Sequence, residues 1–234
     1  MTPILCFPPA GAGASFFAQW RVSVSSGCTL LPVDLPGKEK RYIEEPHRRV
    51  SSLVRQLVPE LRAVIGDADR VALFGHSFGA VLAYEVAFAL AEEAGREVLL
   101  VASGSPGPAT RRELRITGRD DEGFLDGVHQ LTGYRHPALE DPELRELLLP
   151  GLRADIEMHE TYEPEASRLL HLPVIAMRGT DDSLVSAAAA AEWAAVTSGS
   201  FRLEEVPGSH MYLVDRWPEV VGIIQSALSD RASS

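Results

Sequence analysis

Short apolar runs alternate along this chain with longer stretches in which apolar residues recur every three or four positions. A short apolar run bounded by Gly, Pro or charged residues indicates a buried strand, and the longer period indicates an amphipathic helix. Strands that alternate with helices are typical of βαβ units. We therefore expect an α/β fold whose mostly parallel central sheet carries helices on both faces. The six predicted strands are residues 4–7, 29–33, 70–74, 97–102, 173–178 and 201–206.

The clearest helical pattern lies between the second and third predicted strands. Valines and leucines form a wide apolar face there: Val50, Leu53, Val54, Leu57, Val58 and Leu61. This helix is expected to end near Gly66. Further helices are predicted at residues 81–93, 187–196 and 217–228, and Pro218 is tolerable because it falls in a first turn.

One segment interrupts the alternation, because about seventy residues separate two consecutive predicted strands and a single crossover helix needs far fewer. Helical patterns at 123–131 and 141–160 are separated by prolines, and the second carries four leucines on one face: Leu144, Leu147, Leu148 and Leu152. We predict one domain over residues 1–234 with a helical insertion at 105–168 that covers the strand ends as a lid. The alternative is a structural cap without a role in substrate binding.

The prediction of a catalytic site starts from a five-residue motif, Gly75-His76-Ser77-Phe78-Gly79. This motif lies between the strand 70–74 and the helix 81–93. A strand that turns sharply into a helix holds its central residue in a strained conformation, and the flanking glycines allow the neighbouring chain to pass close by. A glycine-rich turn without function would not require this strand-turn-helix context. Ser77 is therefore predicted to be an exposed nucleophile.

A serine hydroxyl needs a histidine as base and a carboxylate that orients the base. In folds with this elbow, the order along the chain is serine, acid, histidine. His210 lies in the turn after the strand 201–206, where a loop can bring its imidazole onto the elbow. The other histidines fall in helical or loop contexts, and His76 would point away from Ser77 on such an elbow.

The acid is expected in the loop after the strand 173–178, where Asp181 and Asp182 are adjacent. The spacing from the preceding glycine favours Asp182, and Asp181 is then expected to cap a turn or face solvent. The predicted catalytic triad is Ser77, Asp182 and His210.

Acyl transfer also needs two amide donors for the oxyanion of the tetrahedral intermediate. One is predicted to be Phe78, the residue after the nucleophile, and the other should come from the loop after the first strand. That loop contains Pro8 and Pro9, which have no amide hydrogen, so the donor must be Ala10 or Gly11. A phosphate-binding loop is excluded, because neither a Gly-Lys-Ser/Thr ending nor regular G-x-G-x-x-G spacing is present.

Composition and charge narrow the classes of partner. The chain has 234 residues, 45% of them hydrophobic, which is enough for one substantial core. Its 33 acidic and 22 basic residues give a net charge of −11. This charge disfavours binding to nucleic acid phosphates and to anionic membrane surfaces.

The two cysteines, Cys6 and Cys28, are too few for a disulfide framework or a zinc site and are expected to be buried free thiols. We expect neither a metal nor a cofactor. The amino-terminal residues lack the basic and apolar regions of a leader, and no window approaches the ~18 apolar residues of a membrane span. A cytoplasmic monomer is expected.

Several motifs resemble those of the type II thioesterases that accompany polyketide synthases and nonribosomal peptide synthetases, which belong to the α/β-hydrolase superfamily. The elbow matches outright, and Lys38 stands where arginine is usual in the family. The resemblance spans nearly the whole chain and is carried by segments 7–11, 35–41, 75–79, 141–144, 149–155, 160–162, 178–182 and 208–210.

This resemblance implies Ser77 as nucleophile, His210 as general base and acid, Asp182 as the orienting acid, and the amides of Phe78 and Ala10 as the oxyanion hole. It also implies the substrate. In this family an acyl group is carried as a thioester on the phosphopantetheine arm of an acyl or peptidyl carrier protein, and its removal frees a stalled assembly line.

Two other functions remain open from the sequence. A carboxylesterase or lipase-like hydrolase would have the same fold and triad, and a scaffold without activity would keep the fold alone. Carrier proteins are usually acidic, so the negative net charge predicts docking through a local basic patch. A cluster of four arginines at the start of the insertion is the candidate, although such a cluster can also be a solvated face: Arg111, Arg112, Arg115 and Arg119.

Overall fold

The computed structural model describes residues 1–93, 95–110, 115–132, 137–165 and 168–230. Six strands form one sheet in the order β2-β1-β3-β4-β5-β6, and every described neighbouring pair is parallel. The predicted α/β architecture and all six predicted strands are confirmed, with ends that differ by at most two residues. The strands are β1 (Thr2–Phe7), β2 (Cys28–Pro32), β3 (Arg70–His76), β4 (Glu97–Ser103), β5 (Val174–Gly179) and β6 (Phe201–Val206).

Helices cover both faces of the sheet because successive strand side chains point to opposite faces. In β1, Leu5 belongs to the apolar core with α1 (Val50–Ile65) and α2 (Phe78–Ala91). Its neighbour Ile4 packs on the other face with the 3₁₀ helix η1 and with α6. The bounds are η1 (Ala14–Ser23) and α6 (Trp217–Asp230). This alternation buries the central strands on both sides.

The shorter elements differ from the prediction in two places. The sequence pattern did not predict η1, which is fixed by tertiary packing of Phe17 and Trp20 against Phe74. The predicted helix 187–196 is a short α5 (Ala187–Ala191) followed by a 3₁₀ turn, η4 (Glu192–Val196). Two further 3₁₀ turns are η2 (Glu39–Arg41) and η5 (Tyr212–Val214).

The two cysteines lie in different surroundings. Cys6 is fully buried in β1, and burial raises the pKa of its thiol far above the usual range. Cys28 begins β2 and is only partly covered, so the expected burial holds for Cys6 alone. Among the described helices, none combines the length and apolar character that crossing a bilayer requires.

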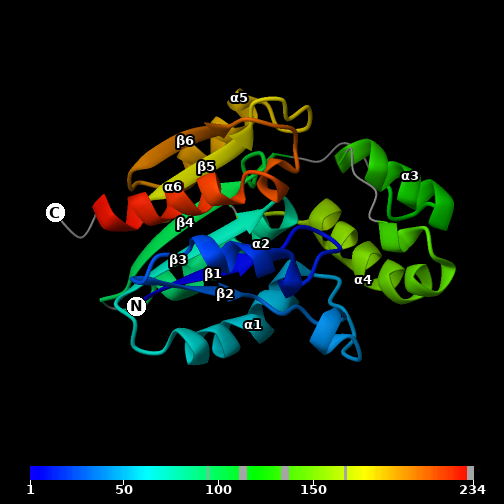
Figure 1. Cartoon of the computed structure of the whole chain (residues 1–234), viewed down its shortest axis with the longest axis horizontal. Coiled ribbons are helices and arrows are strands. Elements are labelled where there is room, and N and C mark those ends of the chain that lie inside the picture. Colours follow the sequence, from blue (N-terminus) through cyan, green and yellow to red (C-terminus); the bar gives the residue numbers. More distant parts are fainter. Residues whose placement is uncertain (94, 111–114, 133–136, 166–167, 231–234) are drawn as a thin grey trace.

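The described helices of the predicted insertion (105–168) lie beyond the carboxyl ends of the strands, at the right of Figure 1. They are α3 (Asp121–Thr132), the 3₁₀ turn η3 (Pro137–Leu139) and α4 (Pro142–Thr161). Asp141 caps α4 by accepting hydrogen bonds from the amides of the second and third helical residues. The insertion has a hydrophobic cluster of its own, formed by Ile116, Phe124, Leu125, Leu139, Leu149, Leu152 and Ile156.

Of the four leucines placed on one face of this helix, only Leu152 is buried. Leu144, Leu147 and Leu148 are 44%, 56% and 38% exposed, so they do not anchor the insertion to the body. By the helical period these three leucines lie on the same side of α4 as Asp155, and this side is covered only near Asp155. The first turns of α4 therefore overhang the body, and this is why their apolar side chains stay uncovered.

Candidate active site

Ser77 occupies the turn between β3 and α2 with φ 55° and ψ −116°, a conformation that a residue with a side chain rarely adopts. Its amide donates to the carbonyl of Ser103 at the end of β4, at 2.8 Å. A side chain on Gly75 would collide with the carbonyl of Gly79. The two glycines therefore allow the tight turn, and the strain makes Ser77 a candidate for a functional residue.

His210 and Asp182 are brought together from the loops after β6 and β5. His210 Nδ1 lies 2.9 Å from Asp182 Oδ2, and both residues are almost completely buried. The other oxygen, Oδ1, accepts from the amides of Leu184 at 2.9 Å and Val185 at 3.1 Å. Because Nδ1 faces the carboxylate, Nε2 is the ring nitrogen left for proton transfer.

The surroundings of Asp182 keep it ionised. Burial by itself would raise the pKa of this carboxyl. The hydrogen bond and charge of His210, with the amides of Leu184 and Val185, outweigh burial and hold the pKa below its ordinary value. Asp181 is instead exposed, and its amide donates to the carbonyl of Gly208 at 2.9 Å, so this residue ties the two loops together through its backbone.

A buried polar group lies behind His210. The ring of His76 packs 5.0 Å from the ring of His210, and its Nδ1 lies 2.8 Å from the hydroxyl of Ser103, which in turn lies 2.6 Å from that of Tyr212. Burial, followed by the charge of His210, keeps the pKa of His76 well below its ordinary value. Sequence reasoning expected His76 to turn away from Ser77 but missed Ser103 and Tyr212. Their only signals are a polar strand end and a tyrosine two residues after His210.

The two amides considered for the first-strand loop differ in their partners. Gly11 donates to Asp155 Oδ2 on α4 at 2.8 Å, whereas the Ala10 amide has no acceptor within the described chain. The Phe78 amide begins α2, where a helix offers it no acceptor. A side chain on Gly79 would collide with the Phe7 carbonyl, so the elbow lies directly against this loop.

The arginines of the predicted docking patch are only partly within the described residues. Arg115 and Arg119 are exposed at the start of the insertion, and Arg119 donates to the carbonyl of Gly123 at 3.5 Å. Arg111 and Arg112 lie outside the described residues.

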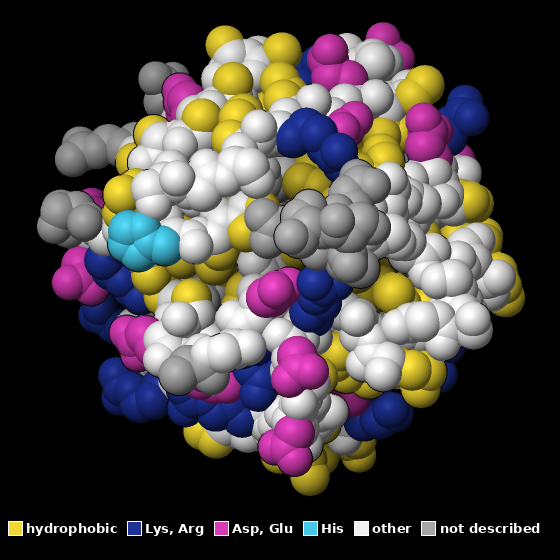
Figure 2. Space-filling view, turned by 90° about the vertical axis from the view of Figure 1, so that its left-hand side faces the viewer, with side chains coloured by type: hydrophobic (Ala, Val, Ile, Leu, Met, Phe, Trp, Pro, Cys, Tyr) yellow, Lys and Arg dark blue, Asp and Glu magenta, His cyan; other side chains and the backbone are white. Residues whose placement is uncertain are grey.

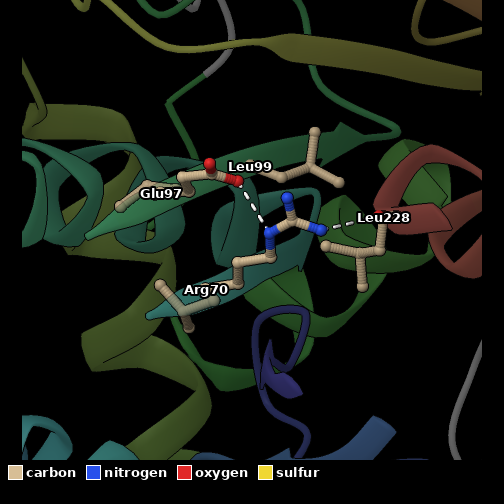
Figure 3. A pocket seen from close by; sticks show the side chains of 6 residues that line it. Arg70, Glu97, Leu99 and Leu228 are labelled. Atoms are coloured by element: carbon tan, nitrogen blue, oxygen red, sulfur yellow. Dashed lines mark hydrogen bonds and ion pairs between the residues drawn. The ribbon is translucent and has the colours of Figure 1, made fainter. Parts of the chain in front are cut away.

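Surface hollows at the opposite edge of the sheet do not belong to this site. Arg70 and Glu97 begin β3 and β4 and pair at 2.8 Å beside a hollow of about 10 Å³, which is room for one water (Figure 3). A second hollow, of about 270 Å³, opens where β5 and β6 begin. Figure 2 shows the side of the molecule away from the insertion, where basic and acidic side chains are interspersed. The candidate nucleophile and histidine pair lie at the carboxyl ends of the strands, where α/β proteins bind ligands.

A family model described as "Thioesterase domain" matches residues 2–228. "Thioesterase PikA5" of Streptomyces venezuelae is 34% identical over 226 residues, which are 96% of this chain and 80% of that protein. "Probable cadicidin biosynthesis thioesterase" of Streptomyces griseus is 32% identical over 98% of this chain. The chain spans 63% of the length of that second relative.

Two solved structures that are similar to this chain are also thioesterases. The type II thioesterase BorB from the borrelidin biosynthetic cluster is 34% identical, with a TM-score of 0.86 over 97% of this chain and 92% of its own. YbtT, a type II thioesterase from the yersiniabactin pathway, is 28% identical, with a TM-score of 0.86 over 95% and 91%. This chain therefore belongs to the thioesterase family and has the α/β-hydrolase fold of the type II thioesterases.

Proposed function

We propose that this protein hydrolyses acyl thioesters on the phosphopantetheine arm of acyl or peptidyl carrier proteins and so clears stalled assembly lines. Membership in the thioesterase family supports the reaction class. The names of three relatives, which place them in the biosynthesis of cadicidin, borrelidin and yersiniabactin, support the substrate. The observation that carries the proposal is the strained Ser77 on its elbow together with the buried pair of His210 and Asp182.

The proposed first half-reaction is acylation of Ser77. His210 Nε2 takes the hydroxyl proton as Oγ forms a bond to the thioester carbonyl carbon. Asp182 orients the imidazole and stabilises its positive charge. The carbon–sulfur bond then breaks, and the proton passes from His210 to the departing pantetheine sulfur. An acyl-serine and a free thiol result.

The second half-reaction hydrolyses the acyl-serine. His210 takes a proton from water as the water oxygen attacks the acyl carbon, and returns it to Ser77 Oγ when the ester bond breaks. Both tetrahedral intermediates carry an oxyanion, for which we propose the amides of Ala10 and Phe78. Neither amide has an acceptor among the residues that the structure describes, and a donor that is free in the resting enzyme can be given to the oxyanion.

We further propose that the helical insertion acts as a lid within a single domain. Its position beyond the carboxyl ends of the strands and its separate hydrophobic cluster support this role. A lid over the acyl-serine would slow its access to bulk water and select among acyl chains.

The proposal is tested by comparing three acyl donors with the same acyl chain: a carrier protein, free pantetheine and an oxygen ester. The highest kcat/KM is expected for the carrier thioester, with Ser77→Ala abolishing turnover and leaving the unfolding midpoint unchanged. A strong preference for the oxygen ester would instead establish a carboxylesterase. Unchanged turnover in Ser77→Ala would overturn the proposed nucleophile.

A further inference from the structure

One buried carboxylate of the insertion reaches the loop that we propose as half of the oxyanion hole. Asp155 lies on α4, 144 positions away from Gly11 in the sequence, and its Oδ2 accepts the Gly11 amide at 2.8 Å. The same oxygen is paired with the ammonium of Lys38. Lys38 follows β2, so three segments that are distant in sequence meet at one carboxylate oxygen.

The arrangement is enclosed. The side chains of Lys38 and Asp155 are 7% and 4% exposed. A buried ion pair contributes little net stability, and apolar residues of similar size would often fold as well or better. Stability alone therefore gives a weak reason for this pair. Its contact with the Gly11 amide gives a functional one.

The loop has one internal hydrogen bond, from the Ala12 amide to the Pro9 carbonyl, which closes a turn over Ala10 and Gly11. Gly11 has φ 78°, a left-handed conformation that glycine adopts freely and also leaves freely. A side chain there would lie 2.6 Å from Leu152 Cδ1, so α4 packs directly on this turn. A hydrogen bond to the Gly11 amide fixes the peptide plane between Ala10 and Gly11. The Ala10 amide belongs to the preceding peptide, whose carbonyl, that of Pro9, accepts from the Ala12 amide at 3.1 Å, so the two hydrogen bonds together fix the direction of the Ala10 amide.

A second carboxylate, that of Glu39, restrains the same loop from its far end. The amide and hydroxyl of Ser15 donate to the carboxylate of Glu39, which directly follows Lys38. Glu39 itself has φ 44°, so its segment is held in a strained conformation. The restraint at Gly11 differs from this one because it comes from the insertion and acts one residue from the proposed donor.

We infer that Asp155 is a positioning residue for the oxyanion hole: its carboxylate, held by Lys38, fixes the Gly11 peptide and so aims the Ala10 amide at the oxyanion. This inference rests on the proposed function, since it presumes attack by Ser77. It also couples the insertion to catalysis. Displacement of α4 from this position would remove the acceptor of the Gly11 amide.

Two variants separate positioning from stability, because the order expected for their activities is the reverse of the order expected for their stabilities. The double variant Lys38→Met/Asp155→Leu replaces the ion pair by apolar side chains, so it is expected to fold stably while the Gly11 amide loses its acceptor. Asp155→Asn keeps a side-chain oxygen for that amide but leaves Lys38 buried without its counter-charge. It is expected to be less stable and yet more active than the double variant.

Kinetics with an acyl-pantetheine thioester provide the readout. The double variant is expected to lose about 10- to 100-fold in kcat with KM changed by less than about threefold, since complete loss of one oxyanion donor costs about 10²- to 10³-fold. A trifluoromethyl ketone analogue, which forms an oxyanion on Ser77, should lose affinity by the same factor as kcat/KM. Asp155→Asn should stay within about tenfold of wild type in both measurements. The matched control is Glu157→Gln, which breaks the exposed pair of α4 with Arg48 and should leave both unchanged.

Wild-type kcat and inhibitor affinity in the double variant would overturn the inference, as would activities that follow stability across all variants. Ser77→Ala distinguishes this failure from that of the proposed function. If Ser77→Ala is inactive while the double variant keeps wild-type kinetics, only the role of Asp155 fails. If Ser77→Ala retains turnover, the proposed function fails, and the inference fails with it.

Discussion

Asp181 and Asp182 are neighbours in sequence with opposite surroundings, and this contrast yields the first prediction. Asp182 is buried against His210, whereas Asp181 is exposed and engages the histidine loop through its backbone. Asp182→Ala is expected to lower kcat about 10³- to 10⁴-fold, because an imidazole without its carboxylate loses its tautomer and orientation. Asp181→Ala, the matched control, should change kcat less than about threefold in the same steady-state assay. The reverse order would reassign the acid to Asp181.

His76 gives a prediction about pH and stability. The folded protein keeps this buried imidazole neutral, whereas the unfolded chain takes up a proton as the pH falls below the ordinary value near 6.5. The unfolded state then binds more protons, so acidification below that value lowers the free energy of unfolding. The contribution of one such group is about 1.4 kcal/mol per pH unit.

Removing the imidazole should remove this part of the slope. Urea unfolding of His76→Gln at pH 7.5, 6 and 5 is expected to show a shallower fall in the free energy of unfolding than wild type. His76→Phe, which also lacks a titratable group, should share the shallower slope even if its absolute stability differs. Parallel curves for wild type and both variants would show that His76 is not kept neutral by the fold.

At this scale the sequence predicts residues whose signal is local. Ser77 stands between glycines after a strand, and His210 and Asp182 follow from chain order and from turns at strand ends. The contacts of Asp155 and Tyr212 carry no such signal, because they join residues that are 144 and 109 positions apart. For the same reason the residues alone left both Ala10 and Gly11 open as the second oxyanion donor, since the acceptor of the Gly11 amide lies on a distant helix.

The helix α4 combines buried and overhanging leucines, which predicts unequal effects of equal truncations. Leu152 is in the cluster of the insertion and contacts the turn at Gly11, so Leu152→Ala is expected to cost about 2 to 5 kcal/mol. Leu147 is 56% exposed, and Leu147→Ala should stay within about 0.5 kcal/mol. Amide hydrogen exchange should show the loss of protection in α3 and α4 for Leu152→Ala. Equal loss in the two variants would mean that Leu147 is covered in solution.

Elements were predictable where one periodicity determines burial. The central strands β1, β3, β4 and β5 are covered on both faces and therefore give continuous apolar runs, and α1 presents one apolar side. The pattern fails for α4, because the same helical side is covered at Asp155 and open at Leu147. Periodicity identifies the apolar side of a helix. Whether that side is covered depends on how far the rest of the fold extends along the helix.

At the scale of the whole molecule, the topology of the sheet brings the candidate site residues together. The elbow follows β3, Asp182 follows β5, His210 follows β6, and the loop of Ala10 follows β1. Because the strands are parallel, these four loops share one edge of the sheet. The sequence predicts this convergence from the alternation of strands and helices alone, whereas the approach of α4 to the Ala10 loop needs the tertiary structure.

At the scale of the whole molecule, charge has two opposing effects on the binding of an acidic carrier protein. The net charge of −11 repels such a partner as a whole, and this repulsion is screened over about 10 Å at 0.1 M salt. Exposed Arg115 and Arg119 lie at the start of the insertion, followed by exposed Asp120, Asp121 and Glu122, and are the described part of the candidate docking site. Net charge acts at long range on the rate of encounter, whereas a docking patch acts only where the partner touches.

Two single charge reversals separate these effects because both change the net charge by the same two units. Arg115→Glu lies in the proposed docking patch, and Arg202→Glu lies near the start of β6, at the opposite edge of the sheet. If docking is local, Arg115→Glu should raise KM for the acyl-carrier substrate about three- to tenfold, while Arg202→Glu should change it by less than about twofold. Neither should alter KM for acyl-pantetheine. An equal rise in the two variants would assign carrier recognition to the net charge, and a rise with acyl-pantetheine would mean that Arg115 affects the acyl site instead.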